Sequence, residues 1–91
     1  MAELEEVFAK TPNAKGKIVE GKAVIINLDK GSYYQLNEVA STVWQLIDGK
    51  TSLEKIVGDL AKEFDASKNE LEKDLLELVA DLKKEGLVEL C

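Results

Sequence analysis

The spacing of apolar residues changes at Asn37, which separates a part of the sequence that favours strands from a part that favours helices. Before this residue, the runs KIVE, AVIINL and SYYQL are rich in β-branched and aromatic residues, and short turns with glycine separate them. In the second run, Val24, Ile26 and Leu28 alternate with their neighbours and so share one face of a strand. We therefore predict a three-stranded antiparallel β-meander.

Three helices are predicted after the meander, and each begins at a capping signal. Asn37 is a good N-cap for a helix that runs to about Asp48. Capping boxes that begin at Thr51 and at Ser67 mark the starts of two further helices, and the last of these ends near Gly86. Strands followed by helices, joined by short turns, predict an α+β, winged-helix-like domain.

The spacing of apolar residues gives a weaker signal in residues 1–16. The stretch TPNAKGK, which begins in this segment, is typical of a loop. We predict that residues 1–16 form a partly mobile N-terminal segment and that residues 17–91 form the domain. A chain of 91 residues suits one small hydrophobic core and leaves little room for a deep catalytic cleft.

The residues most used in catalysis and metal binding are scarce in this sequence. It contains no histidine, and its single cysteine is Cys91. Ser-His and Cys-His nucleophile pairs are therefore excluded, and a structural zinc site would lack ligands. Glu89 lies close to Cys91 in sequence and disfavours a reactive thiolate there. We predict no catalytic residue, no metal site and no cofactor.

The charge balance disfavours two classes of partner. The chain has 12 basic and 18 acidic residues, a formal net charge of −6, which repels nucleic acid and anionic membranes. No apolar run approaches the roughly 18–20 residues that span a bilayer, and the start MAELEEVFAK has none of the features of a signal peptide. We expect a cytoplasmic protein with no membrane or nucleic-acid partner.

The last predicted helix carries an apolar stripe that has two interpretations. Leu71, Leu75 and Leu78 fall on one face, with Asp74 at its border. A wide apolar face can simply cover the sheet and the other helices, or part of it can line a groove beside the third strand. That strand, SYYQL, lies at an edge of the meander and has no proline or lysine to block pairing. An open edge beside an apolar helix suits the addition of an extended peptide as a further strand.

A winged helix-turn-helix that binds DNA has the same order of elements and is the alternative from another class. Between residues 67 and 85 the acidic residues outnumber the basic ones, and the chain contains no arginine, the commonest bidentate reader of guanine. This alternative is therefore disfavoured on charge.

The sequence from residue 17 to residue 90 resembles the family of pyrroloquinoline quinone biosynthesis protein D (PqqD), also known as the recognition element for precursors of ribosomally made, modified peptides (RiPPs). Each matching motif is short, and their order and spacing together carry the resemblance. They are the aromatic strand that ends in Leu36-Asn37, Ala40 and Trp44, Asp48-Gly49, Ile56, Lys73-Asp74-Leu75, and Gly86-Leu87.

The resemblance implies a winged-helix-like domain without catalytic activity. Such proteins bind the leader segment of a precursor peptide and present it to a modifying enzyme, often a radical S-adenosylmethionine (radical SAM) protein. The leader pairs antiparallel with the third strand, and its side chains enter the cleft between that strand and the third helix. Asp74 would then bind a polar or basic leader group. By position, the docking edge is Ser32, Tyr33, Tyr34, Gln35 and Leu36, and the cleft wall is Leu71, Asp74, Leu75 and Leu78.

Other interpretations stay open at this point. Subgroups of this family serve different pathways, of which quinocofactor synthesis is one. A domain that docks to a protein without affinity for a leader is a further alternative. The free edge strand is compatible with a monomer or with an edge-paired or domain-swapped dimer.

Overall fold

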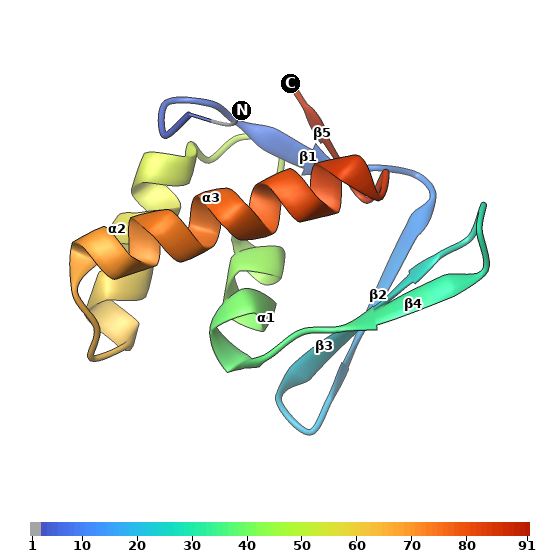
Figure 1. Ribbon diagram of the computed structural model, residues 1–91, viewed down its shortest axis with the longest axis horizontal. Helices are drawn as coiled ribbons and strands as arrows, with labels where there is room; N and C mark the ends of the chain where they lie inside the picture. Colours follow the sequence, from blue (N-terminus) through green and yellow to red (C-terminus); the bar gives the residue numbers. More distant parts are fainter. Residues whose placement is uncertain (1–2) are drawn as a thin grey trace.

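The computed structural model describes residues 3–91 and contains a three-stranded sheet, three helices and a two-stranded sheet (Figure 1). This arrangement confirms the predicted α+β class with a β-meander followed by three helices. The elements in chain order are β1 (Phe8–Lys10), β2 (Ala14–Val19), β3 (Lys22–Asn27), β4 (Ser32–Gln35), α1 (Glu38–Leu46), α2 (Leu53–Glu63), α3 (Lys68–Lys84) and β5 (Val88–Leu90).

The three-stranded sheet has the order β2-β3-β4, and both pairs are antiparallel. Glu20 and Gly21, with φ of 53° and 81°, form the two-residue connection from β2 to β3. Positive φ at both central residues is the geometry of the hairpin turn that matches the twist of paired strands. In the middle of the sheet, Ile25 lies opposite Gly16 on one side and Tyr34 on the other.

The face of β3 that enters the core is the opposite of the one that carries Val24, Ile26 and Leu28. These three do share a face, but Ile26 and Leu28 are 44% and 56% exposed, whereas Ala23 and Ile25 are fully buried. The run AVIINL is apolar on both faces, so alternation alone could not choose between them. Packing of α1 determines which face is buried. The small side chain of Ala23 lets α1 approach, and the backbone N–H of Ala23 donates to the Ser41 hydroxyl at 2.6 Å.

Residues before position 17 take part in the core, which differs from the predicted division of the chain. β1 pairs antiparallel with β5, with Phe8 opposite Leu90, and the Phe8 side chain is 1% exposed. The segment after Gly86 therefore contains a paired strand. Figure 1 shows β1 and β5 side by side above α3. Strand pairing between distant segments leaves no local pattern in a sequence, so β1 could not be recognised from residues 1–16 alone.

The helix starts follow the capping signals with one shift. The Asn37 side chain accepts from the backbone N–H of Ala40 at 2.8 Å, and Ser67 caps α3 as predicted. The cap of α2 is Ser52 and not Thr51. The Thr51 hydroxyl instead donates to Asp48, whose carboxylate also accepts the backbone N–H groups of Lys50 and Thr51. These two backbone hydrogen bonds lower the pKa of Asp48.

Trp44 of α1 packs against β2 and fixes how closely the helix and the sheet approach. The indole is 4% exposed, and a Cβ built on Gly16 would lie 2.5 Å from its Nε1 atom. Glycine therefore allows a contact that any larger residue would block. The Lys10 ammonium lies 4.9 Å from the ring centroid, a cation–π distance, and partial burial lowers its pKa.

Candidate functional site

A groove runs along α3 and consists of two adjoining cavities of about 400 and about 510 Å³. The first cavity lies where α1, α2 and α3 meet, and the second lies between β4 and the C-terminal half of α3. Leu78 and Asp81 line both cavities, so the two lie next to each other. We call the whole the β4–α3 groove.

Eight of the nine site residues named from the sequence line this groove. Tyr33, Tyr34, Gln35 and Leu36 line the second cavity, Leu78 lines both, and Leu71, Asp74 and Leu75 line the first. Ser32 lines neither cavity, and its buried hydroxyl oxygen has no hydrogen-bond partner within the described chain. The structure thus brings together residues from two segments that are far apart in sequence. Their role in peptide binding remains a prediction.

Leu78 differs from the rest of the apolar stripe on α3. Leu71, Leu75, Val79 and Leu82 are buried in the core, whereas Leu78 is only half-buried and faces both cavities. The stripe is therefore wider than the core requires, and its surplus forms the apolar floor of the groove.

The register of β4 identifies the backbone groups at its free edge. The Leu36 N–H donates to the carbonyl of Ala23 at 2.8 Å, so Leu36 directs its N–H towards β3. Bonded pairs alternate along an antiparallel ladder, so Tyr34 also pairs towards β3 while Tyr33 and Gln35 direct their N–H and C=O groups outward. Among the residues that the structure describes, no strand follows β4 in the sheet order. The groove is therefore bordered by two residues whose outward backbone groups have no partner strand within residues 3–91.

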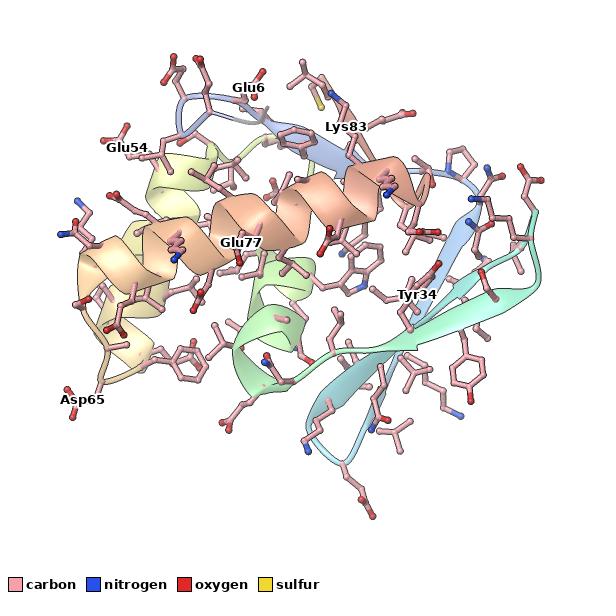
Figure 2. The ribbon with its side chains drawn as sticks, in the orientation of Figure 1. Glu6, Tyr34, Glu54, Asp65, Glu77 and Lys83 are labelled. Carbon is pink, nitrogen blue, oxygen red and sulfur yellow. The ribbon has the colours of Figure 1, made fainter. Side chains whose placement is uncertain are left out.

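A hydrogen bond links β4 to the end of α3 at one end of the groove. The Tyr34 hydroxyl donates to Glu85 Oε2 at 2.6 Å, and the Lys30 ammonium lies 3.7 Å from the same oxygen. Figure 2 shows the Tyr34 side chain extending from β4 towards the C-terminal end of α3. The Tyr34 hydrogen bond, and secondarily the Lys30 charge, hold the pKa of Glu85 below its ordinary value. The ion pair is largely exposed and contributes less than the hydrogen bond.

Carboxylates follow one side of the groove at helical spacing. Asp74, Glu77, Asp81 and Glu85 succeed one another by three or four residues and all line one or both cavities. Of these carboxylates only Asp74 was predicted from the sequence; Glu77, Asp81 and Glu85, and with them Leu82, were not predicted as groove residues. Extending the three-to-four spacing from Asp74 and Leu78 towards the helix end would have found them.

The groove is lined by apolar side chains and by carboxylate, amide, phenol and lysine side chains. Within residues 3–91, no three histidine, cysteine or acidic side chains lie close enough to hold a metal ion. Cys91 is exposed and lies apart from the groove, with its sulfur 3.9 Å from the carbonyl of Gly49. None of the helices in the described part of the chain is both long and apolar enough to cross a membrane.

Relatives in two Xanthomonas species are similar to this chain over part of its length. The "PqqA binding protein" of Xanthomonas oryzae pv. oryzae strain PXO99A is 43% identical over 56 residues, and that of X. campestris pv. campestris strain B100 is 41% identical over the same length. Each match covers 62% of this chain and 61% of the relative. The chain thus spans less than two thirds of the relatives that it matches.

Two solved structures have a closely similar fold. One, "TbiB1 in complex with the TbiA(beta) leader peptide", superposes with a TM-score of 0.82 at 23% identity and covers 89% of this chain and 94% of its own. The other, "Lasso peptide synthetase B1 complexed with the leader peptide", has a TM-score of 0.80 at 24% identity and covers 90% and 96%. At this level of identity the likeness concerns the fold.

The family model described as "Coenzyme PQQ synthesis protein D (PqqD)" matches residues 22–88, which run from the first residue of β3 to the first residue of β5. The match includes β4, all three helices and every residue that lines the groove. It confirms the resemblance found in the sequence motifs, and the chain belongs to the PqqD family.

Proposed function

We propose that this protein is a non-catalytic adaptor that captures the leader segment of a ribosomally made precursor peptide. The leader adds to β4 as an antiparallel strand, and alternate side chains enter the β4–α3 groove. The observation that carries the proposal is the free edge of β4 at Tyr33 and Gln35, directly beside a groove with an apolar floor. Relatives named as PqqA binding proteins, and similar folds solved with leader peptides, support it.

The groove residues divide the work of binding. Within the edge from Ser32 to Leu36, the outward backbone groups of Tyr33 and Gln35 supply pairing, and Leu71, Leu75 and Leu78 supply apolar contact. Some of these residues also hold the core, since Leu36, Leu71 and Leu75 are buried in the free protein. Asp74, exposed at the wall of the first cavity, binds a polar or basic leader group.

The acidic side of the groove sets the charge of the peptide that it accepts. Glu77, Asp81 and Glu85 continue the row that Asp74 begins, so a leader with lysine or arginine on the side facing α3 is favoured. A leader with carboxylates there would be repelled. The groove therefore selects by charge as well as by apolar fit.

As an adaptor, a small domain can contribute to the synthesis of a modified peptide without catalytic residues of its own. Binding the leader on one site and an enzyme on another raises the concentration of substrate at the active site. We propose that the enzyme is a peptide-modifying one of the radical SAM class, in the cytoplasm. The bound leader occupies the edge of β4, which keeps the loaded adaptor from pairing edge to edge with a second copy.

An amide NMR titration of the labelled protein tests the proposal. The ligand is a synthetic leader of the precursor encoded beside its gene, and the control is the same peptide with its residues in scrambled order. We expect saturable shifts in residues 32–36 and 71–82, with the largest at the outward amides of Tyr33 and Gln35. Shifts that are equal for the scrambled peptide, or that fall outside both segments, would contradict strand addition at β4.

A further inference from the structure

The outer face of the three-stranded sheet carries exposed apolar side chains that nothing in the described chain covers. In Figure 1 the helices lie to one side of this sheet. Val19, Ile26 and Tyr33, which the strand register places on the opposite side, are 46%, 44% and 72% exposed. We call this surface the outer sheet face. Its members are Lys15, Lys17, Val19, Lys22, Val24, Ile26, Leu28, Tyr33 and Gln35.

Charge on the outer sheet face is opposite to that of the whole chain. Lys15, Lys17 and Lys22 are exposed there and no carboxylate shares the face, although the chain has a formal net charge of −6. Basic residues that border an exposed apolar surface attract a partner that has carboxylates around an apolar patch. The acidic side of the β4–α3 groove faces a different ligand, and the two surfaces share Tyr33 and Gln35 at the edge of β4.

We propose that the enzyme that modifies the bound peptide binds to the outer sheet face. This inference rests on the leader-binding function proposed above. The matching surface on that enzyme is apolar and bordered by aspartate and glutamate. The three lysines orient the approach, and Val19, Ile26 and Leu28 supply the area buried on contact.

A leader strand on β4 enlarges this same face. Side chains of a strand point alternately to the two sides of a sheet, so a strand paired with β4 sends one set into the groove and the other set outward beside Tyr33. The loaded protein then presents a four-stranded face, part adaptor and part substrate. An enzyme seated there contacts both, and it binds the loaded adaptor more tightly than the empty one.

Charge reversal on the outer sheet face tests the inference. The purified peptide-modifying enzyme encoded beside the gene is titrated with wild-type protein and with the triple variant Lys15→Glu, Lys17→Glu and Lys22→Glu. The matched control is Lys50→Glu, Lys62→Glu and Lys68→Glu, which changes the net charge equally at exposed positions outside the face and the groove. The affinity for the synthetic leader is measured for all three proteins.

We expect the outer-face triple to lose about tenfold or more in enzyme affinity and the control triple to lose much less, with leader affinity unchanged in both. Wild-type protein should bind the enzyme several-fold more tightly when the leader is present. Equal enzyme affinities for the two triples would overturn the inference. The pair Lys17→Gln and Lys22→Gln, which removes charge without adding any, repeats the test if the triple does not fold.

Other occupants of the face give distinct results. Self-association that the outer-face triple abolishes, seen by sedimentation, would assign the face to a second copy and overturn the inference. Binding of duplex DNA that is abolished in the same triple variant would also overturn the inference. The protein could also bind the enzyme through the three lysines and yet bind no leader. That result would overturn the proposed function but would support the docking surface.

Discussion

The Tyr34 hydroxyl on β4 donates a 2.6 Å hydrogen bond to Glu85, one residue beyond the end of α3. The bond joins the edge strand to the helix that forms the opposite wall of the groove, and it therefore helps to set the width between them. A side chain that lines the groove thus also holds it in shape.

Acid should weaken this link. The pKa of Glu85 is lowered from its ordinary value of 4.5, chiefly by the Tyr34 hydrogen bond. A lowered pKa in the folded state means that the stabilisation is complete above the unfolded-state pKa and is lost as the pH falls through the folded-state pKa. We predict that Tyr34→Phe lowers the thermal midpoint at pH 7 and that its difference from wild type shrinks below about pH 4. Melting curves from pH 7 to pH 3 measure both. Tyr33→Phe, at an exposed ring, should change neither.

Blocking one outward amide of β4 should separate peptide binding from folding. Gln35→Pro removes an N–H at the free edge, whereas the N–H of Tyr34 pairs towards β3 and its loss would damage the sheet. We predict that Gln35→Pro weakens leader binding by roughly tenfold, the effect of one hydrogen bond of about 1.4 kcal/mol. Gln35→Ala keeps the N–H and serves as the control. Calorimetric titration with the leader gives the affinities, and equal values for the two variants would count against strand addition.

Removing the Asp74 carboxylate should lower the affinity for the leader without lowering the stability of the fold. Asp74 is exposed, so Asp74→Ala should change the free energy of unfolding by less than about 1 kcal/mol. We predict weaker binding of a leader that carries lysine or arginine, by a factor that decreases as salt is added. Glu72→Ala, on the same helix but outside both cavities, is the matched control. Unchanged affinity in Asp74→Ala would remove this residue from the site.

Two glycine substitutions should change stability in opposite directions. In Gly16→Ala the new methyl would meet the Trp44 indole at 2.5 Å, so we predict a loss of about 1–3 kcal/mol, the usual cost of overpacking. Gly58 lies within α2, and a Cβ there meets nothing within 4 Å. Gly58→Ala should therefore gain about 0.5–1 kcal/mol from helix propensity. Urea denaturation of both variants measures these differences, and a stable Gly16→Ala protein would mean that Trp44 can shift.

The features that could be predicted from the sequence are those that local chemistry determines. Asn37 and Ser67 cap their helices because a side-chain oxygen close in sequence can reach the free N–H groups. The cap of α2 was misplaced by one residue because Thr51 and Ser52 are both capable of capping, and Asp48 engages Thr51. The stripe on α3 left two interpretations open, and in the structure most of it is buried in the core while the half-buried Leu78 lines both cavities.

The features that could not be predicted depend on contacts between distant segments. Either face of AVIINL could have been buried, and the approach of α1 selects the one with Ala23 and Ile25. Glu85 gave no sign of its role, because its partner Tyr34 lies in another element. The resemblance to a family predicted where a peptide-binding site lies, and the structure shows a groove at that place.

Pairing of β1 with β5 has a bearing on the order in which the protein forms during synthesis. Phe8 lies opposite Leu90 and is buried against residues from the other end of the chain, so its place in the core is incomplete until β5 has left the ribosome. The sheet and the helices can assemble earlier, from contacts between neighbouring segments. A nascent chain stalled before residue 88 would therefore expose Phe8 to chaperones and proteases, and pairing of β1 with β5 would come after the earlier elements have formed.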